Sequence, residues 1–269
     1  MDPATAVSEV APRFVAMVRD AVLPTDPSLG SWSAADVAMH LSHSIDAATA
    51  AVLGAGAMVE DVWSLGSLSK MLVAAETDKS PAAIAARVEA SVERFLEVVG
   101  AGAATEERPW MVGGVTFPVE TITAQVLSEL LVHGYDVAKG QGVAWPIASA
   151  HAALAVNRFL FPALGALGAG LVDQKAAAGR RATFEIRVRG GERAWLAFDD
   201  GDLKVTTTAP PAVKGRSPVD CYLSVDPVAF LLVAWGRIDQ WPAVGRGRLL
   251  AWGRRPWLGL QLRSLLRNP

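Results

Sequence analysis

Glu129 and His133, four residues apart in the segment SELLVHGYD, are the pair best suited to chemistry in this sequence. Residues four apart on an α-helix share one face, so the two side chains would lie side by side. The apolar stripe of this helix runs through Val119, Val126 and Val137, which places His133 inside the stripe and Glu129 on its edge. A carboxylate buried without a partner is costly, and a divalent cation would supply the partner.

A third ligand is expected from another helix, in which two histidines are available. The apolar stripe of that segment passes through Val37, Leu41 and Ile45, with His40 on its flank and His43 nearly opposite its centre. We therefore expect His40 to face the interior and His43 to face water. Two histidines and one carboxylate leave a coordination position open for water, a substrate or a thiolate, as catalytic zinc sites do.

The same residues also have a purely structural explanation. An E-x-x-x-H spacing is common by chance and usually forms a hydrogen-bonded pair along a helix. A histidine beside an apolar stripe is more often a core residue than a ligand. On spacing alone, this structural interpretation is favoured. For His151, farther along the chain, we expect a surface position or a hydrogen bond.

Alanine-rich amphipathic segments, which would position these residues, fill the chain up to about residue 140. Their apolar periodicity predicts helices at 6–22, 33–53, 57–76, 80–99 and 117–139. Ser33 and Asp36 form a capping box at the start of the second helix, and Ser80 followed by Pro81 is a helix start. We expect these helices to build a bundle.

The pattern changes after the glycine- and proline-containing stretch GQGVAWP, which predicts one domain over 1–142 and a second over 143–269. A helix at 148–166 is followed by alternating apolar and polar residues that predict three antiparallel strands. A strand at 221–225, a helix opened by Asp226 and Pro227, and a closing helix in WLGLQLRSLL complete the domain. The predicted fold class is mainly α plus α+β, with a helical bundle followed by a small α+β domain that contains an antiparallel sheet.

Composition narrows the possible partners and compartments. The formal net charge is -2, which gives no electrostatic reason to expect nucleic acid. Cys221 is the single cysteine, so no internal disulfide can form, and we expect it to be a small buried residue in a reducing compartment. The first residues do not resemble a secretory signal, and the weakly polar stretch 160–172 is too short and too broken to span a membrane. We therefore expect a soluble, cytoplasmic protein.

Two segments resemble a known pair of signatures. WSAADVAMHL at 32–41 and ELLVHGYDVA at 129–138 are similar to those of the mycothiol-dependent maleylpyruvate isomerase family. The resemblance implies a DinB-like four-helix bundle, a second domain similar to a sterol-carrier-protein fold, and zinc bound by the histidine of the first signature and the Glu and His of the second. Those positions are His40, Glu129 and His133. The resemblance thus favours a divalent metal site, with zinc as the expected ion.

The resemblance also implies mycothiol as a cofactor, because a metal at such a site would bind the thiol and present it as a thiolate. The expected function is a metal-dependent, mycothiol-using isomerase or thiol S-transferase acting on a small electrophilic substrate. In that family the second domain supplies an arginine to the active site. We assign this catalytic role to Arg237, at the end of the helix opened by Asp226 and Pro227, where a cation would also offset the helix dipole.

A carrier of an apolar or amphipathic ligand is the competing function, with the metal site structural or incidental. Trp235, Trp241, Trp252 and Trp257 could line an apolar cavity in the second domain, although we expect most of them to be core residues. A bound metal with an open position favours the enzyme, whereas an enclosed apolar cavity remote from the metal favours the carrier. The sequence leaves the substrate and the oligomeric state open.

Overall fold

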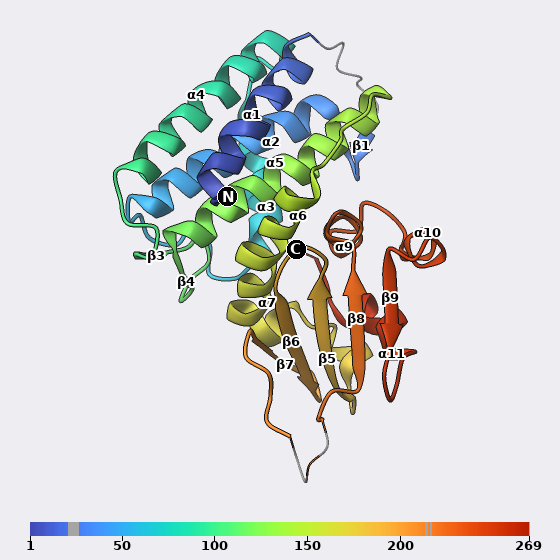
Figure 1. The fold of residues 1–269 in the computed structure, drawn as a ribbon. Helices are drawn as coiled ribbons and strands as arrows, with labels where there is room; N and C mark the ends of the chain where they lie inside the picture. Colours follow the sequence, from blue (N-terminus) through green and yellow to red (C-terminus); the bar gives the residue numbers. More distant parts are fainter. Residues whose placement is uncertain (21–26, 213–214, 216, 269) are drawn as a thin grey trace. The chain divides into compact units, whose positions relative to one another are not determined.

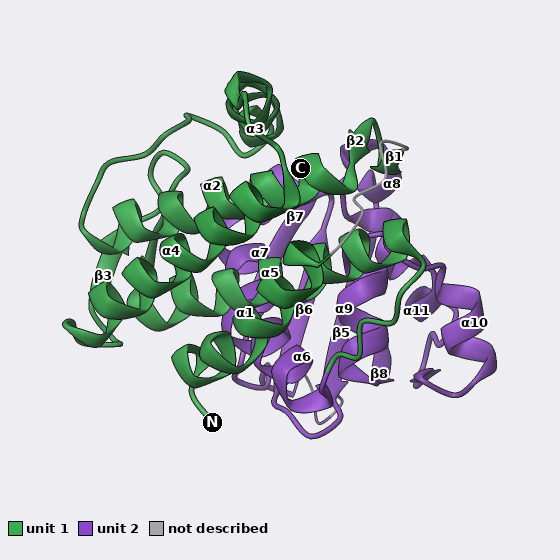
Figure 2. Cartoon of the chain, turned by 90° about the horizontal axis from the view of Figure 1, so that it is seen from above, with its two compact units in different colours: residues 1–147 green, residues 148–269 purple. Residues whose placement is uncertain are grey.

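The computed structural model describes residues 1–20, 27–212, 215 and 217–268, and the chain divides into two compact units, Met1–Ile147 and Ala148–Pro269 (Figures 1 and 2). The first unit is helical apart from short hairpins, and the second carries a mainly antiparallel sheet. This arrangement confirms the predicted fold class. The division lies a few residues beyond position 142, where the sequence indicates it.

Long helices form the first unit. Within its described residues, the four longest are α1 (Pro3–Arg19), α2 (Ala34–Val52), α4 (Pro81–Gly100) and α5 (Val119–Gln141). Helices α1 and α2 each pack against both α4 and α5, which is the arrangement of a four-helix bundle. The stripe residues predicted for α2 and α5 are all buried. Burial of these apolar stripes is the main force that holds the helices together.

Helix α2 starts at the predicted capping box. The Ser33 hydroxyl accepts a hydrogen bond from the Asp36 backbone N–H, and the Asp36 carboxylate accepts one from the Ser33 backbone N–H at 3.1 Å. Lys79 Nζ lies 2.8 Å from the other carboxylate oxygen of Asp36. The start of α2 is therefore fixed both locally and by the segment before α4.

Two features of the first unit differ from the sequence-based expectation. The helix predicted at 57–76 is shorter, because the Asp61 carboxylate accepts hydrogen bonds from the Trp63 and Ser64 backbone N–H groups and starts α3 at Ser64–Ala75. Two short hairpins, not predicted from the sequence, pair β1 (Pro27–Leu29) with β2 (Trp32–Ser33) and β3 (Glu107–Pro109) with β4 (Thr116–Pro118). Residues 21 and 22 of the first predicted helix lie outside the described residues.

The second unit contains a five-stranded sheet among its described residues, in the order β7-β6-β5-β8-β9. The strands are β5 (Arg181–Val188), β6 (Arg193–Asp199), β7 (Asp202–Thr206), β8 (Cys221–Val225) and β9 (Leu249–Trp252). The predicted antiparallel meander of β5, β6 and β7 is confirmed, as is strand β8. The parallel pairing of β5 with β8 and the edge strand β9 were not predicted.

Helices precede and follow this sheet. They are α6 (Ser149–Ala155), a π-helical turn at Val156–Leu160, α7 (Phe161–Leu167), a 3-10 turn at Gly168–Leu171, α8 (Gln174–Ala177), α9 (Pro227–Ala234), α10 (Gln240–Gly245), α11 (Leu258–Gln261) and a 3-10 turn at Leu262–Leu265. The closing helix is thus shorter than predicted. The helical run Ser149–Leu171 is long and apolar enough to cross a membrane, but 56% of its most apolar stretch is buried, as in the core helix of a globular protein.

Gly134 on α5 is required by packing within the first unit. A Cβ atom at this position would overlap the indole ring of Trp145. That ring is held in place, since Trp145 Nε1 donates a hydrogen bond to the Leu131 carbonyl at 3.1 Å and the Arg13 guanidinium lies 4.8 Å from the ring centroid.

We therefore expect Gly134→Ala to lower the free energy of unfolding by about 1–3 kcal/mol, the usual cost of overpacking. Gly66→Ala on α3 is the matched control. A Cβ there meets no neighbour, so alanine should raise stability by up to about 1 kcal/mol through helix propensity alone. Chemical denaturation of both variants measures the difference. A Gly134→Ala protein as stable as the wild type would show that Trp145 can move aside.

Candidate metal centre

Glu129 and His133 lie side by side on α5, one helical turn apart. Glu129 Oε2 is 2.9 Å from His133 Nε2, and the two side chains are 19% and 10% exposed. Helix α5 is buried on almost every side, so these polar groups sit among apolar neighbours rather than on a solvated face. The local geometry is the one that the i,i+4 spacing predicts.

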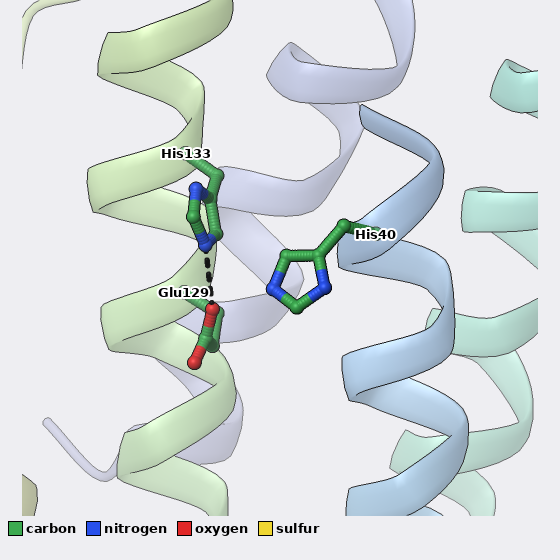
Figure 3. Close-up of side chains that lie close together, drawn as sticks. All are labelled: His40, Glu129 and His133. Carbon is green, nitrogen blue, oxygen red and sulfur yellow. Dashed lines mark ion pairs between the residues drawn. The ribbon is translucent and has the colours of Figure 1, made fainter. Parts of the chain in front are cut away.

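His40 approaches this pair from α2, which packs against α5. Its ring centroid is 5.0 Å from that of His133, and the two rings are perpendicular. Figure 3 shows the three side chains, with the His40 ring pointing from α2 toward the pair on α5. One ligand atom from each of His40, Glu129 and His133 lies within 4.8 Å of the others. The structure thus brings together the three residues selected from the sequence.

The donor atoms of this cluster suit a divalent ion of the zinc type. Imidazole nitrogens and a carboxylate oxygen are donors that zinc accepts in catalytic sites. Around a tetrahedral ion with bonds of about 2.1 Å, neighbouring ligand atoms lie about 3.4 Å apart. Ligand atoms already within 4.8 Å of one another would need only small side-chain rotations to reach this spacing. The residues present therefore fit the implied metal, and their role as ligands stays a prediction.

Two further side chains touch the cluster. Asp136 Oδ2 lies 3.1 Å from His133 Nδ1, and the ring centroid of Trp32, from β2, lies 5.0 Å from that of His40. Sequence reasoning did not select Asp136, although its position three residues after His133 on the same helix was a usable signal. Burial by itself would lower the pKa of His133, but hydrogen bonds to Asp136 and Glu129, together with their charges, raise it to about 9.

The prediction that His43 faces water is wrong. Its side chain is only 12% exposed, with Nε2 3.2 Å from Glu76 Oε1 and Nδ1 3.4 Å from an Arg87 guanidinium nitrogen. Burial, and then the charge of Arg87, lower the pKa of His43 against the opposing charge of Glu76. His43 also lines a cavity of about 280 Å³ together with Leu72 of α3 and other residues, none of which belongs to the cluster. The structure gives His43 neighbours on other elements, which helical periodicity cannot reveal.

The other residues singled out from the sequence belong to the second unit. Arg237 follows α9, and its guanidinium donates a hydrogen bond to the Trp235 carbonyl at 2.7 Å. His151 is buried on α6. Cys221 is fully buried on β8, as predicted, and burial raises the pKa of its thiol. Its role as a packing residue therefore agrees with its environment.

The tryptophans of the second unit are not mainly core residues, contrary to expectation. Trp241, Trp252 and Trp257 are 57%, 40% and 56% exposed. Trp252 of the edge strand β9 stacks on Tyr222, its register partner on the neighbouring strand β8, with their ring planes 16° apart. Side chains this exposed do not line an enclosed apolar cavity, so this observation does not favour a ligand carrier.

Comparison with known proteins identifies a family that this chain matches. The model of the mycothiol maleylpyruvate isomerase N-terminal domain matches residues 4–138, a range that includes His40, Glu129 and His133. No curated protein matches the sequence.

Solved structures agree on the fold. A crystal structure of the mycothiol-dependent maleylpyruvate isomerase is 12% identical, with a TM-score of 0.51, and the match covers 93% of this chain and 91% of that one. A mutant of that enzyme gives 13% identity and a TM-score of 0.52 over 93% and 90%. At these identities the likeness shows the fold alone. A stereoselective inverting sec-alkylsulfatase from Pseudomonas sp. is 15% identical, but the match covers 55% of this chain and only 24% of the sulfatase, and its TM-score of 0.33 is too low to support an argument.

Proposed function

This chain belongs to the mycothiol maleylpyruvate isomerase family, and we propose that it is a metal-dependent, mycothiol-using isomerase or thiol S-transferase acting on a small electrophilic substrate. The observation that carries the proposal is the convergence of His40, Glu129 and His133 from two packed helices of one unit. Family membership suggests the class of reaction. The cluster supplies, in this chain's own residues, the place where such a reaction would be performed.

Each residue of the cluster has a defined part in this proposal. His40 and His133 would offer imidazole nitrogens to a divalent ion, and Glu129 would offer a carboxylate oxygen that also offsets the positive charge of the ion. A bound zinc ion would supply the Lewis acidity that favours the thiolate form of mycothiol over the thiol. Glu129 remains 19% exposed, so solvent reaches this carboxylate. With three protein donors rather than four, the cluster leaves room for an external ligand.

Metal content tests the ligand set directly. We expect the protein purified without chelators to hold about one divalent ion per chain, because three donors on rigid helices form a preorganised site. His40→Ala and His133→Ala should lose most of the metal, whereas His43→Ala should keep it, because His43 pairs with Glu76 and Arg87 instead.

Elemental analysis of the three variants and the wild type gives the answer. A His43→Ala protein without metal beside a His40→Ala protein with metal would show that the ligand is wrongly assigned. A metal-free wild type, even after incubation with zinc, would refute the proposed centre altogether.

Thiol binding tests the reaction class. In cobalt-substituted protein, we expect mycothiol to produce a sulfur-to-cobalt charge-transfer band with release of a proton, because the thiolate is the form that binds. Glu129→Ala should abolish the band. Asp46→Ala, which changes an exposed carboxylate on α2, is the control and should retain it. A filled cobalt site that gives no band with any low-molecular-weight thiol would count against a thiol-dependent enzyme.

Arg237 stays a proposed catalytic residue on the strength of the family resemblance. If its role is only structural, Arg237→Met should cost at most about 1 kcal/mol in stability, because methionine keeps much of the apolar stem. If it is catalytic, thiol-dependent activity should fall at least about tenfold, equivalent to about 1.4 kcal/mol in the barrier, with melting temperature and metal content unchanged. Steady-state kinetics and calorimetry separate the two outcomes. Wild-type turnover in Arg237→Met would assign the arginine to the fold.

A further inference from the structure

Asp136 is a buried carboxylate on α5 that the proposed ligand set does not use. Its side chain is 4% exposed, which is less than that of Glu129 at 19%. Its Oδ2 lies 3.1 Å from Nδ1 of His133, whereas Nε2 of the same ring lies 2.9 Å from Glu129. The His133 ring is therefore held between two carboxylates, one at each nitrogen.

Each contact favours a proton on the ring nitrogen that it faces when His133 is neutral. A neutral imidazole has one N–H donor and one nitrogen with a free lone pair. An ionised carboxylate only accepts hydrogen bonds, so Asp136 favours the tautomer that has its N–H at Nδ1. Glu129 favours the opposite tautomer by the same reasoning, but a metal ion bound to Glu129 would occupy that carboxylate and leave Asp136 to hold the lone pair at Nε2.

Stability alone does not account for an aspartate at this position. Aspartate is a poor residue for a helix interior, and a buried ion pair is often no more stabilising than well-packed apolar residues of similar volume. Leucines and valines fill the neighbouring core positions of α5, so an apolar residue would fit the local pattern. A role tied to the His133 ring explains the polar residue better.

We infer that Asp136 is a positioning residue: it accepts the Nδ1–H of His133 and so keeps the Nε2 lone pair directed at the cluster with His40 and Glu129. The inference depends on the proposed function in one respect, namely that the species bound by Nε2 is a metal ion. Histidine ligands in metal proteins commonly donate their other N–H to a carboxylate, and loss of that partner weakens metal binding.

Two substitutions separate hydrogen bonding from burial. Asp136→Leu removes the acceptor and should weaken zinc affinity by about 10–100-fold, as measured by competition with a chromophoric chelator. Asp136→Asn keeps an acceptor oxygen and should stay within about threefold of the wild type. Asp220→Asn is the matched control. It alters a carboxylate that is 9% exposed and pairs with Arg254 in the second unit, so it should lower the melting temperature without changing zinc affinity.

Zinc affinity in folded Asp136→Leu equal to that of the wild type would overturn the inference. An equal loss in Asp136→Asn and Asp136→Leu would also overturn it, because charge rather than the acceptor would then be responsible. If Asp136→Leu does not fold, the His133 tautomer in a protein that keeps Asp136 but lacks Glu129 tests the inference instead.

Nitrogen-15 spectra of histidine-labelled Glu129→Ala protein report that tautomer. In chelator-treated Glu129→Ala protein, which lacks the competing carboxylate, the neutral His133 ring should carry its proton on Nδ1 because Asp136 is the acceptor that remains. A proton on Nε2 would refute the inference. This measurement needs no metal, so it remains decisive even if the wild type fails to bind zinc and the proposed function falls.

Discussion

Glu129 and Asp136 place carboxylates at the two nitrogens of the His133 ring, inside a bundle whose neighbouring side chains are mostly apolar. Removing a charge from water costs several kcal/mol unless an opposite charge is close by. Protonation of His133 supplies that opposite charge, so the two carboxylates raise the pKa of His133 to about 9 despite burial. A divalent cation would supply a larger opposite charge to the same carboxylates. The proton and a metal ion would therefore compete for Nε2.

The rest of the first unit serves to hold that arrangement in place. Helix α5 lies against both α1 and α2, and its backbone carries Glu129, His133 and Asp136 within two turns. His40 depends on α2, whose start is fixed by the capping box and by the ion pair between Asp36 and Lys79. Trp32 comes from the strand just before α2 and lies against the His40 ring. Such contacts restrict the side-chain rotations that would otherwise spread the donor atoms apart.

Local features of the sequence predicted most of the helices. The wrong or missing predictions concern contacts between residues that are distant in the chain. Apolar periodicity located the long helices because each buries a stripe set by its own residues. Strand β9 and the parallel pairing of β5 with β8 were missed because they depend on residues distant in the chain. His43 was misjudged for the same reason, since Glu76 and Arg87 lie outside its helix.

Prediction of the metal-ligand cluster needed both local spacing and information from outside a single helix. Its Glu129–His133 half follows from four-residue spacing on one helix, but His40 and the metal role depended on resemblance to family signatures. Asp136 was overlooked although its spacing from His133 is equally local, because it lies outside the apolar stripe, where a polar side chain is the ordinary expectation. The exposed tryptophans show the opposite error, in which aromatic character was equated with burial.

The environment of Cys221 explains why the chemistry proposed for this chain needs an external thiol. A thiol becomes a good nucleophile or metal ligand when it ionises, which nearby positive charge favours and apolar burial opposes. Cys221 is fully buried on β8, its Sγ contacts the carbonyl oxygens of Tyr222 and Pro256, and burial raises its pKa. The only cysteine of the sequence is thus kept in its unreactive form. The proposed centre with two imidazoles and one carboxylate would complement this lack, because its remaining coordination position would be available to a thiol that diffuses in.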